Sequence, residues 1–374
     1  MTHTSQEQAN GQHRARAAVR RPPGVPPTPR HTVADPASLD ALLATLPASL
    51  DDTALAAAAH RLIEAFPHLP RPGAGNTLAR WRFLAGVAGR DLPLVKLVEA
   101  HADADAILAE LGGPMPAGRE PGLLAVWAAR SPAGDLRIST RSTRSGSAGS
   151  ARLDGTKAWC SGAHCVDTAL VTCIDADGHD RLAIVAMRQP GVTISARGWD
   201  ALGMRATRSV EVDFVDAAAT LVGPPGAYVQ RPGFWHGGAG IAACWYGGAA
   251  ALATRLRDAA GKRDDPHLHA HLGTADIALT AARALLRETA QAIDAEPRAD
   301  AMAAALRARG AAEHAADTVL RAAQRGLGAG PLCRDRWFAQ MAADLPVFLR
   351  QSHAERDLAA LGAALATSRP GWRL

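Results

Sequence analysis

The chain has 374 residues, of which 48% are hydrophobic and 21% are charged, and its formal net charge is +5. These proportions are those of a globular protein, and they exclude a wholly disordered or collagen-like chain. Only three of the 41 basic residues are lysines, and the arginines are interleaved with acidic residues along the chain. A nucleic-acid-binding surface would gather basic charge in one patch, so we expect no nucleic-acid partner.

Cysteine usage and hydropathy predict a soluble protein of the cytoplasm. The five cysteines form no CxxC pair, so we expect free thiols in a reducing compartment. Residues 1–36 are polar and rich in Pro and Arg, which predicts a disordered tail and no signal peptide. No run approaches the roughly 18 consecutive apolar residues of a membrane-spanning helix. The alternating histidines of PHLHAH would splay on a helix, so we expect no metal site.

Residues 37–120 show a helical spacing of apolar residues. Leu39, Leu42, Leu43 and Leu46 form one stripe, and the segment 92–113 keeps the helical period until it meets a pair of glycines. Prolines at positions 67, 70 and 72 separate the helices. This pattern predicts an N-terminal helical domain.

Residues 121–223 show a period close to two. Eight short segments rich in Val, Ile and Thr are separated by Asp-Gly, Gly-His and Pro-Gly turn signals. They predict a compact antiparallel β-barrel, with a sandwich as the alternative. The Ser/Arg/Gly-rich run at 139–150 is typical of an exposed hairpin tip.

Residues 224–374 return to the helical period, with long Ala- and Leu-rich stretches at 239–260, 270–294, 298–326 and 335–366. Four long helices in succession predict a bundle. The predicted fold is therefore multidomain α+β, with an N-terminal helical domain, a middle antiparallel β-barrel and a C-terminal four-helix bundle.

Two local sequences give this order of elements a chemical meaning. Residues 153–161 are LDGTKAWCS, and residues 201–217 are ALGMRATRSVEVDFVDA. With the order of the elements, they resemble the acyl-CoA dehydrogenase family of flavoproteins over most of the chain. The resemblance implies an FAD cofactor, with Trp159 packed on one flavin face and Ser161 hydrogen-bonded near flavin N5. Positions i and i+2 of a strand share a face. Singly, these residues could be a core aromatic and a turn hydroxyl.

The resemblance implies further FAD-binding residues in the C-terminal region. Arg263 follows a helix similar to the one whose Arg binds the FAD pyrophosphate across a dimer interface, and a guanidinium suits two phosphates. Gln324, Gly328 and Gly330 match the family's glycine-containing loop. These matches imply a homodimer or homotetramer. The alternatives are a solvated helix-end Arg and an ordinary connection between helices.

The catalytic base that the resemblance implies is displaced. A dehydrogenase of this family needs a carboxylate that removes the proton alpha to the thioester while a hydride passes to flavin N5. The counted positions hold Arg334 and Gly237, and Asp335 is the nearest candidate base. Asp335 could instead balance the dipole of the last helix. The first hypothesis is an FAD-dependent oxidoreductase that oxidises the Cα–Cβ bond of an acyl thioester.

Other departures from the family favour an alternative function. Arg130 replaces a Glu of the family's flavin-side motif, and Trp127 could cover part of the ring or belong to the core. His353 and Asp357 replace the usual Glu-Gly-Thr ending and lie four residues apart, which on a helix is one face. This ending looks like that of the flavin monooxygenase branch, where a neutral His could donate a hydrogen bond to the flavin. A solvated helix surface is the other interpretation.

Three functions therefore remain open from the sequence. The first is the acyl-CoA dehydrogenase type of reaction, and the second is a flavin-dependent monooxygenase on the same fold without the catalytic Glu. The third is a helical scaffold that has lost its flavin. The substrate, an acyl thioester or another small molecule, is not identified by the sequence.

Overall fold

Four helices form the first part of the chain in the computed structural model, which describes residues 35–113, 122–130, 134–140, 151–367 and 372. They are α1 (Pro36–Ala44), α2 (Asp52–Ala65), α3 (Thr77–Arg90) and α4 (Leu92–Leu111). Asp35, Asp51 and Asp91 each accept a hydrogen bond from a first-turn N–H of α1, α2 and α4. These caps satisfy donors that a helix start leaves unpaired. The helical prediction is confirmed here.

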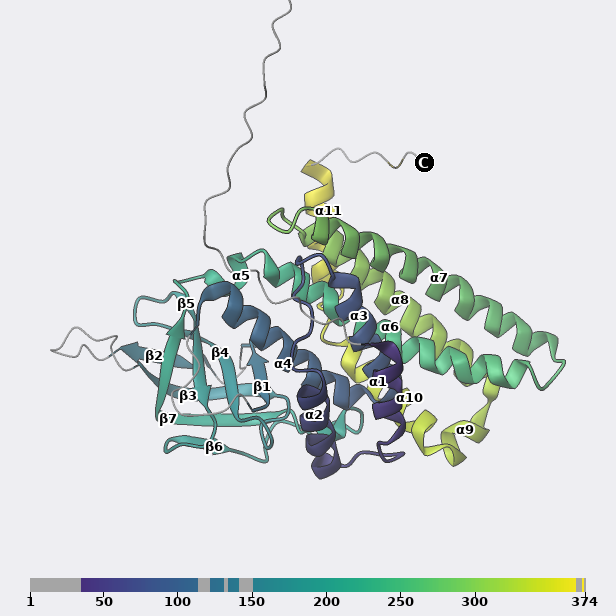
Figure 1. Cartoon of the computed structure of the whole chain (residues 1–374), viewed down its shortest axis with the longest axis horizontal. Helices are drawn as coiled ribbons and strands as arrows, with labels where there is room; N and C mark the ends of the chain where they lie inside the picture. The colour runs from purple at the N-terminus through teal and green to yellow at the C-terminus, as the bar shows by residue number, and fades with distance from the viewer. Residues whose placement is uncertain (1–34, 114–121, 131–133, 141–150, 368–371, 373–374) are drawn as a thin grey trace, which may run out of the picture. The chain divides into compact units, whose positions relative to one another are not determined.

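The described residues contain seven strands. They are β1 (Leu124–Trp127), β2 (Arg137–Thr140), β3 (Ala151–Cys160), β4 (Thr168–Ile174), β5 (Asp180–Ala186), β6 (Val192–Ile194) and β7 (Val210–Val222). Strands β4, β2, β3, β7 and β5 pair in that order, and β5 pairs with β4 again, so the sheet closes into a small barrel (Figure 1). The prediction of a wholly antiparallel barrel is wrong, because β1 and β2 run parallel to β4. Turn signals do not reveal such pairs, whose strands are distant in sequence.

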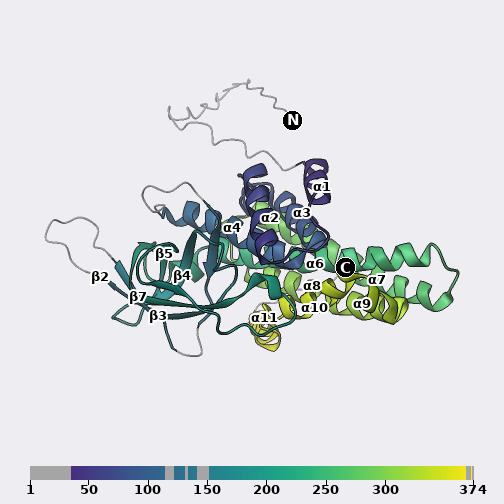
Figure 2. The same cartoon turned by 90° about the horizontal axis from the view of Figure 1, so that it is seen from below.

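Strand β3 is one continuous strand, although an Asp-Gly turn signal lies within it. It pairs with β7 along its length, and Figure 2 shows the two side by side. The register shifts twice, between Leu153 and Gly155 and between Lys157 and Cys160. Gly155 and Trp159, within these irregular stretches, have φ angles of 122° and 54°. Bulges of this kind bend a strand and re-aim a side chain, and the Asp-Gly signal marks the first bulge instead of a turn.

The remainder of the described chain is helical. It contains α5 (Ala227–Gln230), α6 (Gly233–Ala260), α7 (Pro266–Ala295), α8 (Met302–Leu327), α9 (Ala329–Arg334), α10 (Arg336–Leu349) and α11 (Glu355–Thr367). The first three helices predicted for the bundle are present as α6, α7 and α8. The fourth, predicted over 335–366, is broken between α10 and α11, where Ala354 adopts a left-handed φ of 44° and donates its N–H to the Ser352 hydroxyl.

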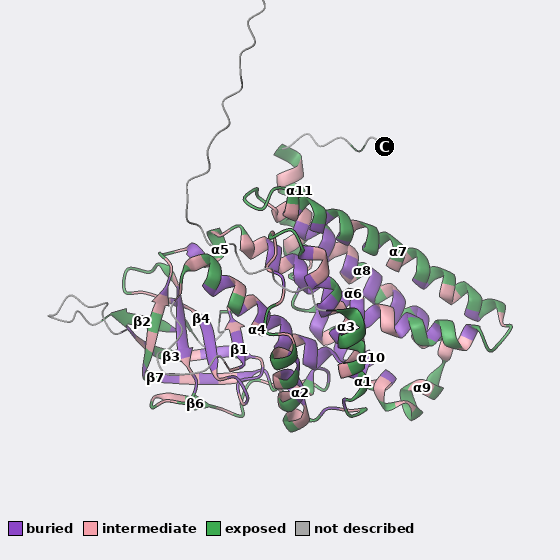
Figure 3. Cartoon of the chain, viewed as in Figure 1, coloured by how far each residue is buried: buried purple, intermediate pink, exposed green. Residues whose placement is uncertain are grey.

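One hydrophobic core extends through the helices and the barrel. Its largest fully buried side chains include Trp81 of α3, Phe214 of β7, Trp245 of α6 and Phe338 of α10. Figure 3 shows continuous buried faces on α6 and α8, while the outer face of α7 is exposed. Because the core is shared, the barrel and the helices around α6 hold each other in place.

Some sequence predictions fall on residues outside the described ranges. The tail predicted at 1–36 is described only from residue 35, and the hairpin tip predicted at 139–150 is described only to residue 140. The domain boundaries expected at residues 120 and 223 stay predictions. Among the helices of the described ranges, none has the length and apolar character to cross a membrane.

The segment between β6 and β7 joins the barrel to α10. It contains a short 3-10 helix, η1 (Arg205–Thr207), and the Met204 N–H donates to the carboxylate of Asp344 in α10. A Cβ on Gly203 would lie 2.1 Å from the carbonyl oxygen of Ala343, so only glycine permits this approach. Met204 and Arg208 have φ angles of 55° and 41°, and left-handed backbone costs non-glycine residues about 1–2 kcal/mol each. Tertiary contacts must therefore hold this segment.

Replacing Gly203 by Ala should destabilise the fold. The new methyl group would collide with the backbone of α10, which cannot move aside as a flexible side chain can, so we expect the free energy of unfolding to fall by about 2–3 kcal/mol. Urea denaturation measures this change. Gly273→Ala in α7 is the matched control, because nothing lies within 4 Å of its Cβ position, and alanine should add up to about 1 kcal/mol. Equal stability of the two variants would contradict the close contact.

Candidate functional site

Trp159 and Ser161, the residues expected to contact a flavin, lie at the C-terminal end of β3. Trp159 is 48% exposed and leaves the strand alternation at its φ of 54°. Ser161 lies beyond the strand, in a turn whose Gly162 packs against Leu97 of α4. The expectation that both share a strand face is therefore wrong, because it assumes regular alternation. A bulky residue at positive φ is uncommon, and such strain concentrates at functional sites.

Ser161 begins a chain of hydroxyl groups that connects the two motifs. Its Oγ lies 2.8 Å from Ser209 Oγ, which lies 2.9 Å from Thr207 Oγ1. The Thr207 hydroxyl donates to the Met204 carbonyl oxygen at 2.7 Å. Ser209 and Thr207 are 4% and 1% exposed, so water does not compete for these bonds. The flavin-binding motif of β3 predicts a role for Ser161 only, although Thr207 and Ser209 lie in the second motif, within MRATRS (204–209).

A buried acid, Asp344 of α10, holds the far end of this chain. Its Oδ1 accepts from the Met204 N–H and from Gln340 Nε2, while its buried Oδ2 has no hydrogen-bond partner among the described residues. Burial raises the pKa of Asp344 from 3.8 to about 7, against the opposing effect of the two hydrogen bonds. Nothing in the amphipathic pattern of α10 signals a buried acid, which is why sequence reasoning missed it.

Trp127 lies behind the Ser161 turn. It is 3% exposed, and its indole N–H donates to the Ser161 carbonyl oxygen at 3.1 Å. This environment corresponds to the core-aromatic alternative for Trp127. In this position the side chain fixes the backbone of Ser161 rather than offering a surface to a ring.

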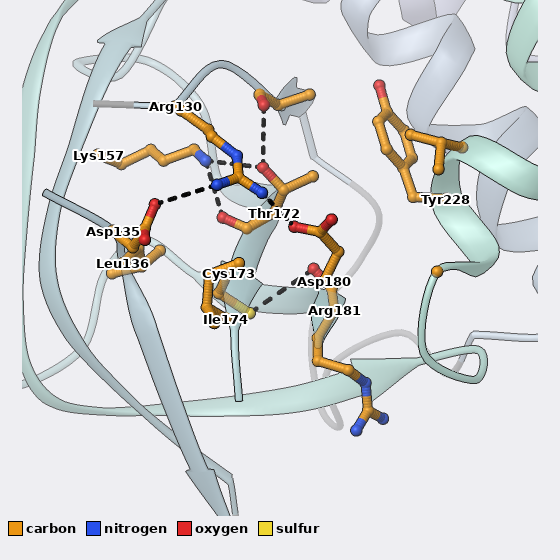
Figure 4. Close-up of a pocket in the computed structure, with 13 residues that line it drawn as sticks. Arg130, Asp135, Leu136, Lys157, Thr172, Cys173, Ile174, Asp180, Arg181 and Tyr228 are labelled. Carbon is orange, nitrogen blue, oxygen red and sulfur yellow. Dashed lines mark hydrogen bonds and ion pairs between the residues drawn. The ribbon is translucent and has the colours of Figure 1, made fainter. Parts of the chain in front are cut away.

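A cavity of about 150 Å³ is lined by residues of β3, β4, β5 and α5 (Figure 4). Lys157 donates from Nζ to the carbonyl and hydroxyl oxygens of Thr172, at 2.7 and 2.8 Å. Burial lowers the pKa of Lys157 from 10.5 to about 8. Arg130 lies 2.9 Å from Asp180 and 3.8 Å from Asp135. The cavity is lined by none of the predicted flavin-binding residues, so it is separate from the Trp159 segment.

Asp335, the candidate base, is engaged in the start of α10. Its Oδ1 accepts from the Phe338 N–H at 3.1 Å, and its Oδ2 lies 3.8 Å from Arg255 of α6. The Arg255 guanidinium in turn lies 4.9 Å from the centre of the Trp337 ring. These contacts correspond to the helix-acid alternative for Asp335. The role of Asp335 as a base remains a prediction.

The residues expected to bind a neighbour's FAD lie at one end of α6, α7 and α8. Arg263 is exposed in the turn between α6 and α7, and Gln324 is half-buried near the end of α8. Gly328 caps α8 and exposed Gly330 lies within α9, so most of the predicted glycine loop is helical. Gly326 packs against α6 and α7, which brings these segments together. Their binding role stays a prediction.

His353 and Asp357 meet, although not on one helix face. His353 lies in the turn before α11, where its N–H donates to Asp357 Oδ2 at 3.2 Å and its Nδ1 lies 3.4 Å from Oδ1. Arg309 of α8 lies 3.8 Å from the same carboxylate. The role of His353 toward a flavin therefore stays a prediction.

Comparisons with known proteins show the fold. No family model matches the chain, and no curated protein matches it either. The FMN-bound dibenzothiophene monooxygenase TdsC from Paenibacillus sp. A11-2 superposes with a TM-score of 0.72 at 18% identity, over 89% of this chain and 96% of that one. Butyryl-CoA dehydrogenase from Megasphaera elsdenii gives 0.70 at 16% identity, over 83% and 90%. XiaF from Streptomyces sp., in complex with FADH2 and glycerol, gives 0.65 at 18% identity, over 89% and 96%.

These structures share one architecture with the chain across nearly its full described length. The chain therefore has the acyl-CoA dehydrogenase fold, as the resemblance implied, and the sequence has diverged far within it. The same fold carries a dehydrogenase and a monooxygenase, so the fold alone does not choose between these reactions.

Asp344 should make the stability of the protein fall as the pH rises. Between the unfolded pKa of 3.8 and the folded pKa of about 7, the native state holds a proton that the unfolded state releases. The stabilisation is fully present below about pH 4 and lost as pH rises through 7, by up to about 4 kcal/mol. Asp344→Asn should flatten this slope in denaturation curves at stepped pH. Asp91→Asn is the comparison, since burial raises the pKa of Asp91 to about 6, and it should flatten only the part below that pH.

Proposed function

We propose that this protein is a flavin-dependent oxygenase that seats the flavin against Trp159 and Ser161 and acts on a small molecule. When bound in reduced form, a flavin supplies two electrons to molecular oxygen, so that one oxygen atom enters the substrate and the other leaves as water. The fold shared with flavin-bound proteins supports the flavin cofactor, although it does not choose the reaction. The observation that carries it is the engagement of Asp335 in a helix cap and an ion pair.

The contacts of Asp335 support oxygenation over dehydrogenation. Dehydrogenation needs a carboxylate free to take a proton from carbon, aimed at the substrate. One carboxylate oxygen of Asp335 accepts a hydrogen bond from the Phe338 N–H, and the other forms an ion pair with Arg255. Oxygenation by a reduced flavin needs no such base. The chemistry that the described residues favour is therefore oxygenation.

The residues around the end of β3 suit a flavin. Trp159 offers an exposed aromatic plane that can stack on a ring, and Ser161 offers a hydroxyl close by in sequence. Arg263, Gln324 and Gly328 would complete the pyrophosphate side of an FAD bound to a second copy, which requires a homodimer or homotetramer. FMN carries one phosphate and no adenine, so it would depend less on these residues.

Dehydrogenation of an acyl thioester is the second candidate. Butyryl-CoA dehydrogenase shares the fold, and the Asp335 side chain is still 36% exposed. Under this candidate the Arg255 ion pair would have to open when substrate binds. Bound acyl-CoA would then lose its alpha proton to Asp335.

A flavin reduction and oxygenation assay should separate the candidates. We expect no bleaching of bound FAD or FMN by a panel of acyl-CoAs in the absence of air. We expect 18O to appear in a product when reduced flavin, 18O-labelled oxygen gas and an apolar probe such as indole or dibenzothiophene are supplied.

Asp335→Asn makes this assay sharper, because Asn is as good a helix cap as Asp. The variant should oxygenate within about twofold of wild type under the proposed function. Bleaching by an acyl-CoA that falls at least about 100-fold in the variant would establish the dehydrogenase instead. Failure of the protein to bind any flavin would sink both reactions.

Trp159→Gly should separate stability from flavin binding. Glycine adopts a φ of 54° without strain, and the change removes a half-exposed aromatic, so the free energy of unfolding should stay equal or rise by about 1 kcal/mol. The flavin Kd should rise at least about tenfold through lost stacking. Thermal denaturation and fluorescence titration measure the two effects. Trp372→Gly is the control, because it removes an exposed tryptophan far along the chain from β3. An unchanged flavin Kd in Trp159→Gly would remove Trp159 from the site.

A further inference from the structure

The hydroxyl chain behind Ser161 has a fixed direction. Each Ser or Thr hydroxyl carries one hydrogen and can donate once. The carbonyl oxygen of Met204 has no hydrogen, so the Thr207 hydroxyl must be the donor at 2.7 Å. Thr207 can then only accept from Ser209, and Ser209, having spent its hydrogen, can only accept from Ser161.

The surroundings keep this direction from reversing. Thr207 and Ser209 are almost fully buried, so no bulk water supplies a replacement donor or acceptor. The backbone of Thr207 is held at both ends, since its N–H donates to the Met204 carbonyl at 3.1 Å and its carbonyl accepts from the Gly162 N–H at 2.7 Å. The Met204 end is in turn anchored on Asp344. The chain therefore points from Ser161 toward α10.

The other hydrogen bonds of Ser161 use its backbone. Its N–H donates to the Trp159 carbonyl at 3.0 Å, and its carbonyl accepts from Trp127. The hydroxyl hydrogen is thus committed to Ser209, and the two lone pairs of Oγ are what Ser161 can offer to a ligand.

We propose that Thr207 and Ser209 act as positioning residues that make Ser161 an acceptor and so select the redox form of the flavin. This inference rests on the proposed function. Flavin N5 is an acceptor when the ring is oxidised and carries a hydrogen when it is reduced. When Ser161 is an acceptor, it accepts a hydrogen bond from the N5–H of reduced flavin. Toward oxidised flavin, a lone pair of Ser161 Oγ faces the lone pair of N5 and the two repel. The site therefore prefers reduced flavin. That preference suits an enzyme that receives its flavin already reduced.

Anaerobic titrations with oxidised and reduced FMN and FAD test this proposal. Wild-type protein should bind the reduced flavin with a Kd about tenfold lower than that of the oxidised flavin. The difference reflects one hydrogen bond that forms with reduced N5 and cannot form with oxidised N5. Ser209→Ala frees the Ser161 hydroxyl to rotate and donate, so the preference for reduced flavin should fall about tenfold. The midpoint potential of the bound flavin should fall with it, by about 30 mV, because tenfold in a two-electron equilibrium corresponds to about 30 mV.

Matched variants separate the effect of losing a hydroxyl group from the effect of disturbing the packing. Ser209→Thr keeps the hydroxyl and should keep the wild-type preference. Thr207→Val keeps the shape and removes the acceptor for Ser209, so it should reproduce the effect of Ser209→Ala and serves if that variant does not fold. On a Ser161→Ala background, Ser209→Ala should change nothing further, because the group through which it acts is gone.

The outcomes distinguish this inference from the proposed function. Tighter binding of oxidised than of reduced flavin by wild type overturns the inference and leaves a flavin enzyme in place. A shift that persists on the Ser161→Ala background also overturns it, since Ser209 would then act by another route. Absence of binding in both redox forms overturns the inference together with the proposed function.

Discussion

The hydrogen bond between Asp344 of α10 and the Met204 N–H is the contact on which the candidate site depends. Beside it, Gly203 lies so close to α10 that a Cβ would be 2.1 Å from a carbonyl oxygen. The two contacts place the end of the barrel on the helices and hold Met204 in a left-handed conformation. The carbonyl oxygen of Met204 then accepts the hydrogen bond of the Thr207 hydroxyl. This bond sets the donor-to-acceptor direction of the whole hydroxyl chain.

Holding this segment with an acid has an electrostatic consequence. A carboxylate loses hydration when it is buried, and one oxygen of Asp344 is left without a partner among the described residues. The pKa of Asp344 is therefore raised to about 7, so the protonated acid is favoured below about that pH. Lys157 in the barrel cavity shows the converse shift, to about 8, although both of its hydrogen bonds are to Thr172. Local hydrogen bonds reduce such costs without removing them.

The hydrophobic period predicted the kinds of element well, because it acts locally. It failed where tertiary contacts override local preference. The turn at Ala354 breaks a helix that the Ala- and Leu-rich pattern predicts as continuous, and the bulge at Trp159 turns a side chain out of alternation. The parallel pairing of β1 with β4 joins strands from distant parts of the sequence. The burial of Asp344 likewise depends on what packs against α10, which one sequence does not display.

The candidate site is best understood through the direction of its hydrogen bonds. From the sequence, Ser161 and His353 are polar groups that could face a flavin, and Asp335 is a carboxylate that could take a proton. In the proposed hydroxyl chain the hydrogen of Ser161 goes to Ser209, and the backbone N–H of His353 donates to Asp357. Ser161 thus offers an acceptor, while the carboxylate of Asp335 is engaged by a helix start. An acceptor hydroxyl beside an engaged carboxylate matches a flavin that arrives with its hydrogen in place more closely than one that must take a hydride from its substrate.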